Sequence, residues 1–463
     1  MIFNIDPGAV AGLGNEEKAL MTRLLEIYHR NSGANERKKK YYEGKIALGD
    51  VNLGLALPDG MRRLEIGCAW GTKAVDVLAA RSMFDGYVDT NGQAVDALEP
   101  IVAGNNLLVA YGKACRDELT FGSTFATLSG DERIGAKIRF HSPLGAAAAW
   151  DGDRGRIAGG FAVIDAAPTE EKDRHIAPRV IYLYTDDAIW VLVRDGERWG
   201  SRPYPQPMGR PLMEPMSWNA TSDKPFGRSR IKEPVRRLID GYVRTIANAS
   251  IGLEFATSPQ KYILGVTDEQ YNALVNDKFK QYVGSILAST ANPETGDKPT
   301  FGQLTQGSLQ PHADMLRMLS AQFAAATGLT VSDVGVVTDA NPTSADAILA
   351  QSGTLISTAE QLNACNAESL KTIALMALAI ANSTTLDGLS ADEQSVMAHF
   401  KNPAMPSVAA TADAAVKIAG ARQGFAETDV FLEMLGFSQA DIRRIRSQEQ
   451  RARGQAILQE LEL

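Results

Sequence analysis

The sequence predicts an α+β fold built from several domains. Its 463 residues are too many for one compact core, so two to four domains are expected. Between residues 119 and 200, short alternating strands follow one another with only turn signals between them, whereas apolar residues at helical spacing come before and after this region. Strands without intervening helices form an antiparallel sheet, which argues against a doubly wound parallel one.

Composition narrows the class of protein. The net charge of −8 argues against a protein that grips nucleic acid with a broad basic face. The three cysteines and five histidines are scattered without metal-ligand spacing, so neither a metal nor another cofactor is expected. The most apolar segment, 372–382, is shorter than the roughly 20 residues that cross a bilayer, which predicts a soluble protein.

The first half begins with an amphipathic helix over residues 15–31. The run Lys38-Lys39-Lys40 beside Tyr41 and Tyr42 fits either a nucleic-acid patch or a solvated helix face, and three lysines at one helix end favour the solvated face. Strands are expected at 125–128, 137–140, 160–164, 180–184 and 189–193. A proline-rich linker is expected at 202–215.

The second half alternates helices with a small insert. A helix over 231–256 has Pro234 in its first turn and one apolar stripe: Ile231, Val235, Leu238, Tyr242, Ile246, Ala249 and Leu253. The α/β insert has strands at 260–266, 283–288 and 300–305 and a helix at 268–282. A helix over 311–327 stops at Gly328, and after a loop a helix capped by Thr343 continues to about 382. The remaining residues are predicted to be helical and end in an arginine-rich helix.

The stretch 64-LEIGCAWG-71 resembles the glycine-rich turn of S-adenosylmethionine-dependent methyltransferases, but three observations oppose that interpretation. Ala69 and the bulky Trp70 replace the glycine that would let a cofactor approach. The preceding segment contains two arginines where a central parallel strand is apolar, and antiparallel strands follow. Trp70, Val75 and Leu78 instead predict the apolar face of a packed helix. The sequence also contains neither a GxxxxGK[ST] loop nor a GxSxG elbow, so we expect no enzymatic activity.

Several short segments, taken in order, resemble the portal proteins of tailed bacteriophages with long non-contractile tails. They are 69-AWGTKAVDVLAARSMFDGY-87, 104-GNNLLVAYGKACRDELTFGSTFATL-128, 141-HSP-143, 184-YTDDAIW-190, 224-KPFGRSRI-231, 254-EFATSPQKYILG-265, 326-ATGLTVSDVG-335 and 341-NPTSADAI-348. Each is short, and their shared order over about residues 40–350 makes the resemblance specific. Thr330-Val331 departs from it, because a proline is expected after Gly328-Leu329.

The resemblance implies a ring, usually of twelve copies, at one vertex of the capsid. Double-stranded DNA would pass through its channel, pumped in by a separate terminase and later ejected. It also implies a domain order: a wing over 1–230, stem helices over 231–256 and 311–327, a clip over 257–310, a tunnel loop over 328–342, a long wing or crown helix over 343–382, and a crown with C-terminal helices over 383–463.

The partners implied are the terminase large subunit, a head–tail adaptor, and the major capsid and scaffolding proteins, with the protein located in the virion after assembly in the host cytoplasm. The expected tunnel-loop residues are Leu329, Val331, Ser332, Asp333, Val334, Gly335, Val336, Val337, Thr338, Asp339 and Asn341. The expected stem-packing residues are Leu238, Tyr242, Ile246 and Leu253, and the clip residues are Tyr262, Ile263, Leu264 and Phe301. The main alternative is a structural capsid protein that does not form the channel.

Overall fold

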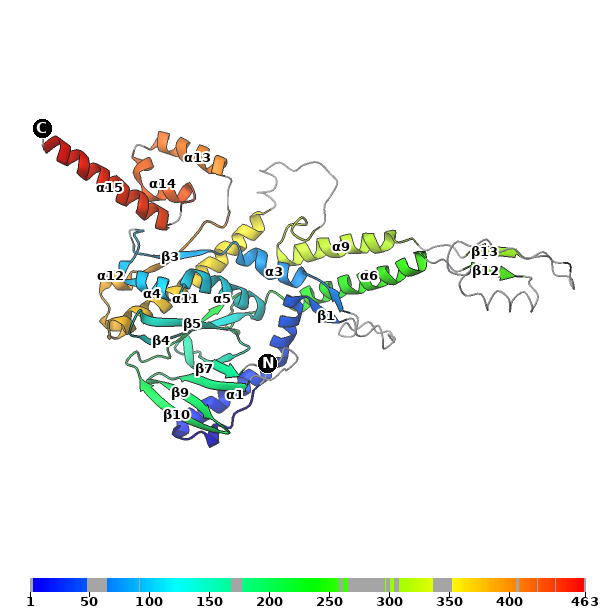
Figure 1. Cartoon of the computed structure of the whole chain (residues 1–463), viewed down its shortest axis with the longest axis horizontal. Helices are drawn as coiled ribbons and strands as arrows, with labels where there is room; N and C mark the ends of the chain where they lie inside the picture. Colours follow the sequence, from blue (N-terminus) through cyan, green and yellow to red (C-terminus); the bar gives the residue numbers. More distant parts are fainter. Residues whose placement is uncertain are drawn as a thin grey trace. The chain divides into compact units, whose positions relative to one another are not determined.

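The computed structural model describes residues 3–47, 65–90, 92–167, 177–257, 261–264, 296, 300–303, 308–335, 352–404, 408–422, 424–437 and 439–461. The chain forms two compact units (Figure 1). Unit 1 comprises Met1–Gly44, Ala69–Arg236 and Ala324–Leu463, and unit 2 comprises Lys45–Cys68 and Arg237–Phe323. The mixture of long helices and antiparallel sheets confirms the predicted α+β class.

Unit 1 contains two larger antiparallel sheets. One is a five-stranded meander in the order β10-β9-β8-β7-β6, and the other has three strands in the order β11-β4-β5. The strands are β4 (Ser123–Asp131), β5 (Gly135–His141), β6 (Ala146–Asp151), β7 (Arg156–Ala167), β8 (Ala177–Tyr184), β9 (Ala188–Asp195), β10 (Arg198–Pro205) and β11 (Met213–Ser217). All five strands predicted between 125 and 193 are therefore confirmed.

The N-terminal helix α1 (Asn15–Glu43) closes one face of the five-stranded sheet. Its residues Met21, Leu24 and Tyr28 are buried in a cluster with Phe161 of β7 and Leu183 of β8. The Tyr28 hydroxyl donates a hydrogen bond to the Leu144 carbonyl at 2.9 Å, which satisfies the polar end of an otherwise apolar side chain.

Strands β6, β10 and β11 and the side chain of Lys38 differ from the sequence-based expectations. The predicted linker at 202–215 contains the end of β10 and the start of β11, because both are edge strands, where a proline removes no ladder hydrogen bond. Strand β6 was missed because its run of alanines lacks the β-branched and aromatic residues typical of strands. Lys38 is not on a solvated face: its ammonium donates to the Phe121 carbonyl at 2.6 Å, and burial lowers its pKa to about 8.

One glycine near residue 70, Gly71, has a packing role. Helix α3 (Trp70–Ala79) buries Trp70, Val75 and Leu78 as predicted. A Cβ atom at Gly71 would overlap the Tyr41 carbonyl oxygen, so this glycine lets α3 approach the last turn of α1. In unit 2, β2 (Glu65–Gly67) pairs antiparallel with β1 (Lys45–Ala47). A methyltransferase would have a parallel strand at the position of β2.

Helix α11 (Gly353–Ala381) contacts β4, β5 and β11 of the three-stranded sheet. By length and composition it could cross a membrane, and 44% of its most apolar window is buried inside the protein. Leu362, Leu370 and Ile373 are among its fully buried side chains, so the helix serves unit 1 as a core element. The predicted N-cap, Thr343, lies outside the described residues.

A buried polar cluster joins α11 to α5 (Leu107–Phe121). The Asn366 amide donates to Glu118 Oε2 at 2.8 Å and to the Tyr111 hydroxyl at 3.1 Å, and Ser82 Oγ lies 2.6 Å from the same hydroxyl. Glu118 is fully buried, and this burial raises its pKa to about 8, against a smaller lowering by the Asn366 hydrogen bond. The carboxyl group is therefore protonated at neutral pH.

The last part of unit 1 is mostly helical, as predicted, but it also contains a strand that the sequence analysis did not predict. It begins with η4 (Leu386–Gly388) and α12 (Ala391–Gln394), and β14 (Met397–Phe400) then pairs with β3 (Phe84–Val88). The helices α13 (Val408–Ala421), α14 (Asp429–Met434) and α15 (Gln439–Leu461) follow. Around β3 lie η3 (Asp96–Leu98) and α4 (Glu99–Gly104), which precede α5.

Glu118 predicts a pH-dependent stability. Below pH 4.5, its ordinary pKa, the carboxyl is protonated in both the folded and unfolded chain; between pH 4.5 and about 8 only the folded chain keeps the proton. The free energy of unfolding should therefore fall by several kcal/mol as pH rises through this window. Glu118→Gln should remove this contribution, measured by urea unfolding at pH 6 and pH 9. Glu360→Gln, an exposed position on α11, is the control and should leave the slope unchanged.

Candidate channel segment

Two antiparallel helices, α6 (Glu233–Thr257) and α9 (Gln310–Thr327), occupy the positions expected for the stem. Pro234 lies in the first turn of α6, where its missing N–H group removes no helical hydrogen bond. In unit 2 the helices lie side by side (Figure 1): a Cβ atom at Gly241 would come 3.2 Å from Leu319, and one at Gly252 would come 3.4 Å from Leu309. The two glycines thus give room to leucines of the partner helix.

The buried stripe of α6 differs from the predicted one. Val235, Ile239, Val243 and Ala247 are buried, with Ile239 and Val243 at 0% exposure. Of the predicted stem-packing residues, Leu238, Tyr242 and Ile246 are only half-buried and Leu253 is 49% exposed. Within the protomer, the predicted stripe is therefore wrong for the residues after Val235. Two apolar stripes run along this helix about one position apart, and helical periodicity alone does not rank them.

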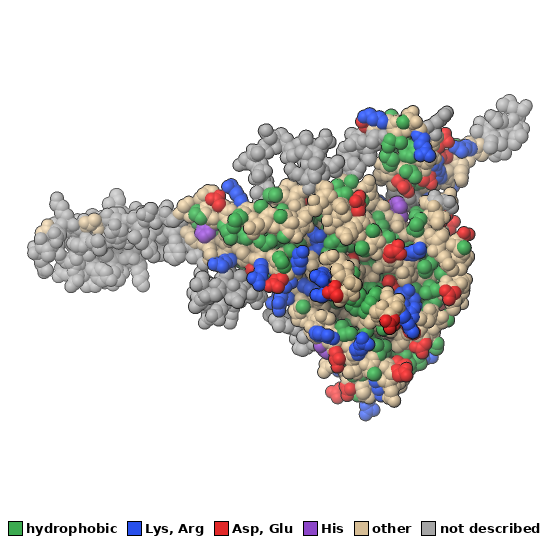
Figure 2. Space-filling model, turned by 180° about the vertical axis from the view of Figure 1, so that it is seen from behind, with side chains coloured by type: hydrophobic (Ala, Val, Ile, Leu, Met, Phe, Trp, Pro, Cys, Tyr) green, Lys and Arg blue, Asp and Glu red, His purple; other side chains and the backbone are tan. Residues whose placement is uncertain are grey.

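The arginines of α6 differ in their exposure to solvent. Arg237 and Arg244 are exposed, whereas Arg236 is half-buried and donates to the Ile231 carbonyl at 2.7 Å. Leu309, just before α9, and Met315 and Met318 within it are 36–48% exposed. Hydrophobic side chains are visible on the described surface of this helix pair in Figure 2.

The turn after α9 is held by a reciprocal set of hydrogen bonds. Gly328 adopts φ +67°, a left-handed conformation that suits the predicted helix stop. The Thr330 amide and hydroxyl both donate to Asp333 Oδ2, at 3.0 and 2.7 Å, and the Asp333 amide lies 3.2 Å from Thr330 Oγ1. This is the arrangement of a capping box, so the Asp333 carboxylate is committed to the turn.

The expected tunnel-loop residues are only partly described. Leu329 is buried, Val331 and Ser332 are exposed, Asp333 and Val334 are half-buried, and Gly335 has φ +91°. Val336, Val337, Thr338, Asp339 and Asn341 lie outside the described residues. The sequence Thr330-Val331-Ser332-Asp333 has the spacing of a capping box and could have been recognised, although such a box was expected only at Thr343.

Arg230 joins the turn to the rest of unit 1. Its Nε donates to the Ala74 carbonyl of α3 at 2.6 Å and its Nη2 to the Thr327 carbonyl of α9 at 2.5 Å, and its guanidinium lies 5.9 Å from the Trp218 ring centroid. The side chain is only 9% exposed, and burial lowers its pKa to about 10, so it stays charged at neutral pH. In the sequence, Arg230 stands out only as part of the segment 224-KPFGRSRI-231.

The expected clip is described at one strand pair. β12 (Lys261–Leu264) pairs antiparallel with β13 (Thr300–Gln303), with Tyr262 opposite Gly302, Ile263 opposite Phe301, and Leu264 opposite Thr300. The predicted helix at 268–282 and strand at 283–288 lie outside the described residues. Across the described part of the chain, no group of three or more His, Cys, Asp or Glu side chains could hold a metal ion.

Comparison with known proteins identifies the group to which this arrangement belongs. The family model described as phage portal protein, SPP1 Gp6-like, matches residues 23–455. A portal protein of Mycobacterium phage D29 is 24% identical over 454 residues, covering 95% of this chain and 89% of the relative. A portal protein of Mycobacterium phage L5 is 23% identical over 422 residues, covering 88% and 84%.

Two solved structures are similar at lower identity. A chain from the neck of a native GTA particle, computed with C12 symmetry, has a TM-score of 0.44 at 14% identity, with 80% of this chain and 90% of that chain covered. A chain from the neck of an empty GTA particle, computed with C6 symmetry, has a TM-score of 0.46 at 14% identity, with 77% and 87% covered.

The buried stripe of α6 can be tested by placing a charge on each of the two stripes. Val243→Asp should lower the free energy of unfolding by about 3 kcal/mol or more, because it buries a carboxylate at a position with no exposure. Ile246→Asp, on the half-buried stripe of the same helix, should cost the isolated protomer much less. Urea unfolding of dilute protein measures both, and equal losses would show that the stripe is misassigned.

The Arg230 contacts predict a second loss of stability. Arg230→Lys keeps the charge but cannot reach both carbonyls with one ammonium group, so it should lower the free energy of unfolding by about 2 kcal/mol. It should also speed amide hydrogen exchange in residues 328–335. The control is Arg228→Lys, since Arg228 is half-exposed and pairs with Asp223 at 3.6 Å. If both variants behave alike, Arg230 does not hold this junction.

Proposed function

Because the chain belongs to the phage portal protein family, it is a portal protein, a head–tail connector, and we propose that it closes into a ring of about a dozen copies. Double-stranded DNA passes through the central channel of this ring during packaging and ejection. The ring resides in the virion at one capsid vertex after assembly in the host cytoplasm. In this proposal the portal catalyses no reaction, and the terminase large subunit supplies the work of packaging.

The exposed apolar residues of the helix pair support ring formation. Leu253 of α6 and Leu309, Met315 and Met318 beside or on α9 are 36–49% exposed in the single chain. Leu238, Tyr242 and Ile246 add a half-buried apolar stripe on α6. Isolated apolar side chains on a surface are ordinary, but several on one helix pair mark an interaction site. A neighbouring subunit would cover them, and this is the observation that carries the proposal.

The segment after α9 suits a channel that DNA must slide through. Residues 329–342 contain Asp333 and Asp339 and neither lysine nor arginine. Each phosphate neutralised by a cation adds affinity through counterion release, so a basic loop would hold DNA in place. A loop with small, apolar and acidic residues narrows a channel without binding phosphates.

In this proposal each remaining part of the chain has its own role in the ring. Residues 1–230 form the wing and α6 and α9 the stem. The clip, 257–310, docks the terminase and later the head–tail adaptor through the β12–β13 end. Residues 343–382 and 383–463 form the long helix and the crown, which face the major capsid and scaffolding proteins during assembly.

Mass measurement tests the ring directly. Size-exclusion chromatography with light scattering, or native mass spectrometry, should give a closed assembly of about a dozen chains of 49.8 kDa each. A structural capsid protein outside the channel would give no such ring, and a stable monomer at high concentration would contradict the proposal.

The channel assignment predicts an effect of charge in the loop. Asp339→Lys should give the ring a salt-dependent affinity for duplex DNA and slow packaging, since it adds a cation to every copy. Asp333 is left unchanged in the first variant because its carboxylate holds the turn, and the double variant Asp333→Lys, Asp339→Lys should act more strongly. Asp387→Lys, at an exposed position in η4, is the matched control. Normal packaging rate and DNA length in Asp339→Lys would place the loop outside the channel.

A further inference from the structure

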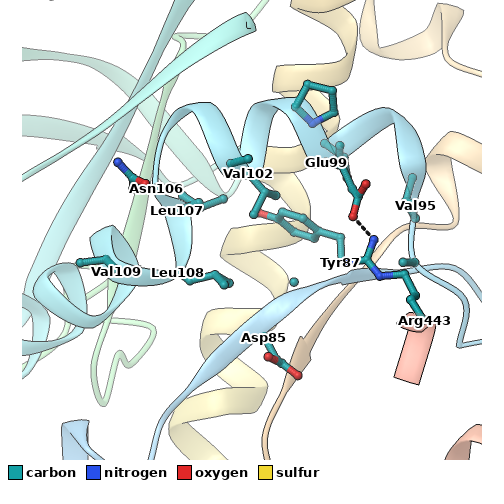
Figure 3. A pocket seen from close by; sticks show the side chains of 15 residues that line it. Asp85, Tyr87, Val95, Glu99, Val102, Asn106, Leu107, Leu108, Val109 and Arg443 are labelled. Atoms are coloured by element: carbon teal, nitrogen blue, oxygen red, sulfur yellow. Dashed lines mark ion pairs between the residues drawn. The ribbon is translucent and has the colours of Figure 1, made fainter. Parts of the chain in front are cut away.

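An apolar groove of about 590 Å³ opens in unit 1 between β3, α4 and the first turn of α5 (Figure 3). Val95, Val102, Leu108 and Val109 contribute to its lining. Leu108 is 46% and Val109 63% exposed, whereas Leu107 beside them is fully buried. The start of α5 therefore presents two adjacent apolar side chains to solvent at the edge of a hollow, which is a feature of docking surfaces.

The groove has an acidic border. Residues 85–109 contain Asp85, Asp89, Asp96 and Glu99 and neither lysine nor arginine. Asp85 and Glu99 are themselves lining residues; Asp85 lies 3.8 Å from Lys401 Nζ, whereas Asp96 beside the groove is exposed. Arg443 reaches the groove from α15 and forms an ion pair with Glu99, as drawn in Figure 3. A partner with apolar side chains flanked by arginines would complement this surface.

The C-terminal segment, residues 408–461, has that chemistry. Val416 and Ile418 of α13, Val430 of α14 and Phe437 before α15 are 40–65% exposed. Within residues 442–454 of α15 there are five arginines and a single acidic residue, Glu449. Arg444, Arg451 and Arg453 are exposed. The segment thus combines uncovered apolar side chains with a basic helix, the complement of an apolar groove with acidic edges.

We propose that the groove receives the C-terminal segment of an adjacent copy of this chain, with exposed apolar side chains in the groove and α15 arginines along the acidic border. The proposal rests on ring formation. The chain's own segment places Arg443 at Glu99 yet leaves Leu108, Val109 and its own apolar residues exposed. In a head-to-tail ring each subunit meets the next through two different surfaces, and this chain carries such a complementary pair.

Photocrosslinking within mixed rings tests the contact. Chains with p-benzoylphenylalanine in place of Val109 are assembled with a large excess of ¹⁵N-labelled wild-type chains, so that each carries labelled neighbours. After irradiation, the expected adduct joins position 109 to a labelled peptide from residues 408–461. The control places the same group at Val193 of β9, which is 47% exposed, and should give no adduct with that segment.

Assembly provides a second measurement. Val109→Asp should raise the concentration for half-assembly at least tenfold while leaving the far-ultraviolet spectrum and the unfolding midpoint of dilute protein unchanged, because Val109 is exposed in the single chain. Val193→Asp should assemble like the wild type.

The outcomes separate this inference from the proposed function. Rings in which position 109 crosslinks to its own unlabelled segment, to another region of the neighbour, or to nothing overturn the groove assignment alone. Wild-type chains that form no ring overturn the proposed function and this inference with it.

Discussion

The buried guanidinium of Arg230 is the constraint on which the arrangement of the turn after α9 depends. A buried cation is costly unless hydrogen bonds compensate for its lost hydration, and here the acceptors are main-chain carbonyls of α3 and α9. The carbonyl of Thr327 belongs to the last turn of α9, where the negative end of the helix dipole favours a cation. One side chain therefore fixes where α9 ends relative to α3.

The residues around Arg230 extend this junction to α5. The Arg230 amide donates to the Leu119 carbonyl at 2.9 Å, and Ser229 Oγ donates to the Thr120 carbonyl at 2.5 Å. A Cβ atom at Gly227, whose φ is +66°, would overlap the carbonyls of Trp218 and Gly122, so only glycine permits this approach. The segment 224-KPFGRSRI-231 is thus a structural joint at which α6 begins and α9 ends. Its residue types follow from those contacts.

The sequence predicted best where local pattern decides structure. Strands rich in β-branched and aromatic residues and helices with clear stop signals were found, whereas the alanine strand β6 and the proline-containing edge strands were missed. The buried stripe of α6 was misjudged because two stripes compete and only packing against other elements chooses between them. The cluster of Glu118 with Asn366 could not be predicted, since its members are 248 residues apart and each looks like an ordinary polar helix residue. Likewise, Arg230 lies 156 residues from Ala74 in sequence, so no local pattern reveals its role.

Formation of a ring would explain why the chain leaves several apolar residues only partly buried. A chain that exposed one large apolar face would aggregate before assembly, whereas exposed side chains shared among the α6–α9 pair, the groove and the C-terminal segment leave each patch small. Each patch alone gives a weak contact. In a ring, however, every copy makes the same contacts with two neighbours, and the last subunit closes contacts that have become intramolecular, at high effective concentration. Modest interfaces therefore suffice for a stable closed ring. The same weakness in open chains lets a wrongly joined subunit dissociate before closure, which favours rings of uniform size.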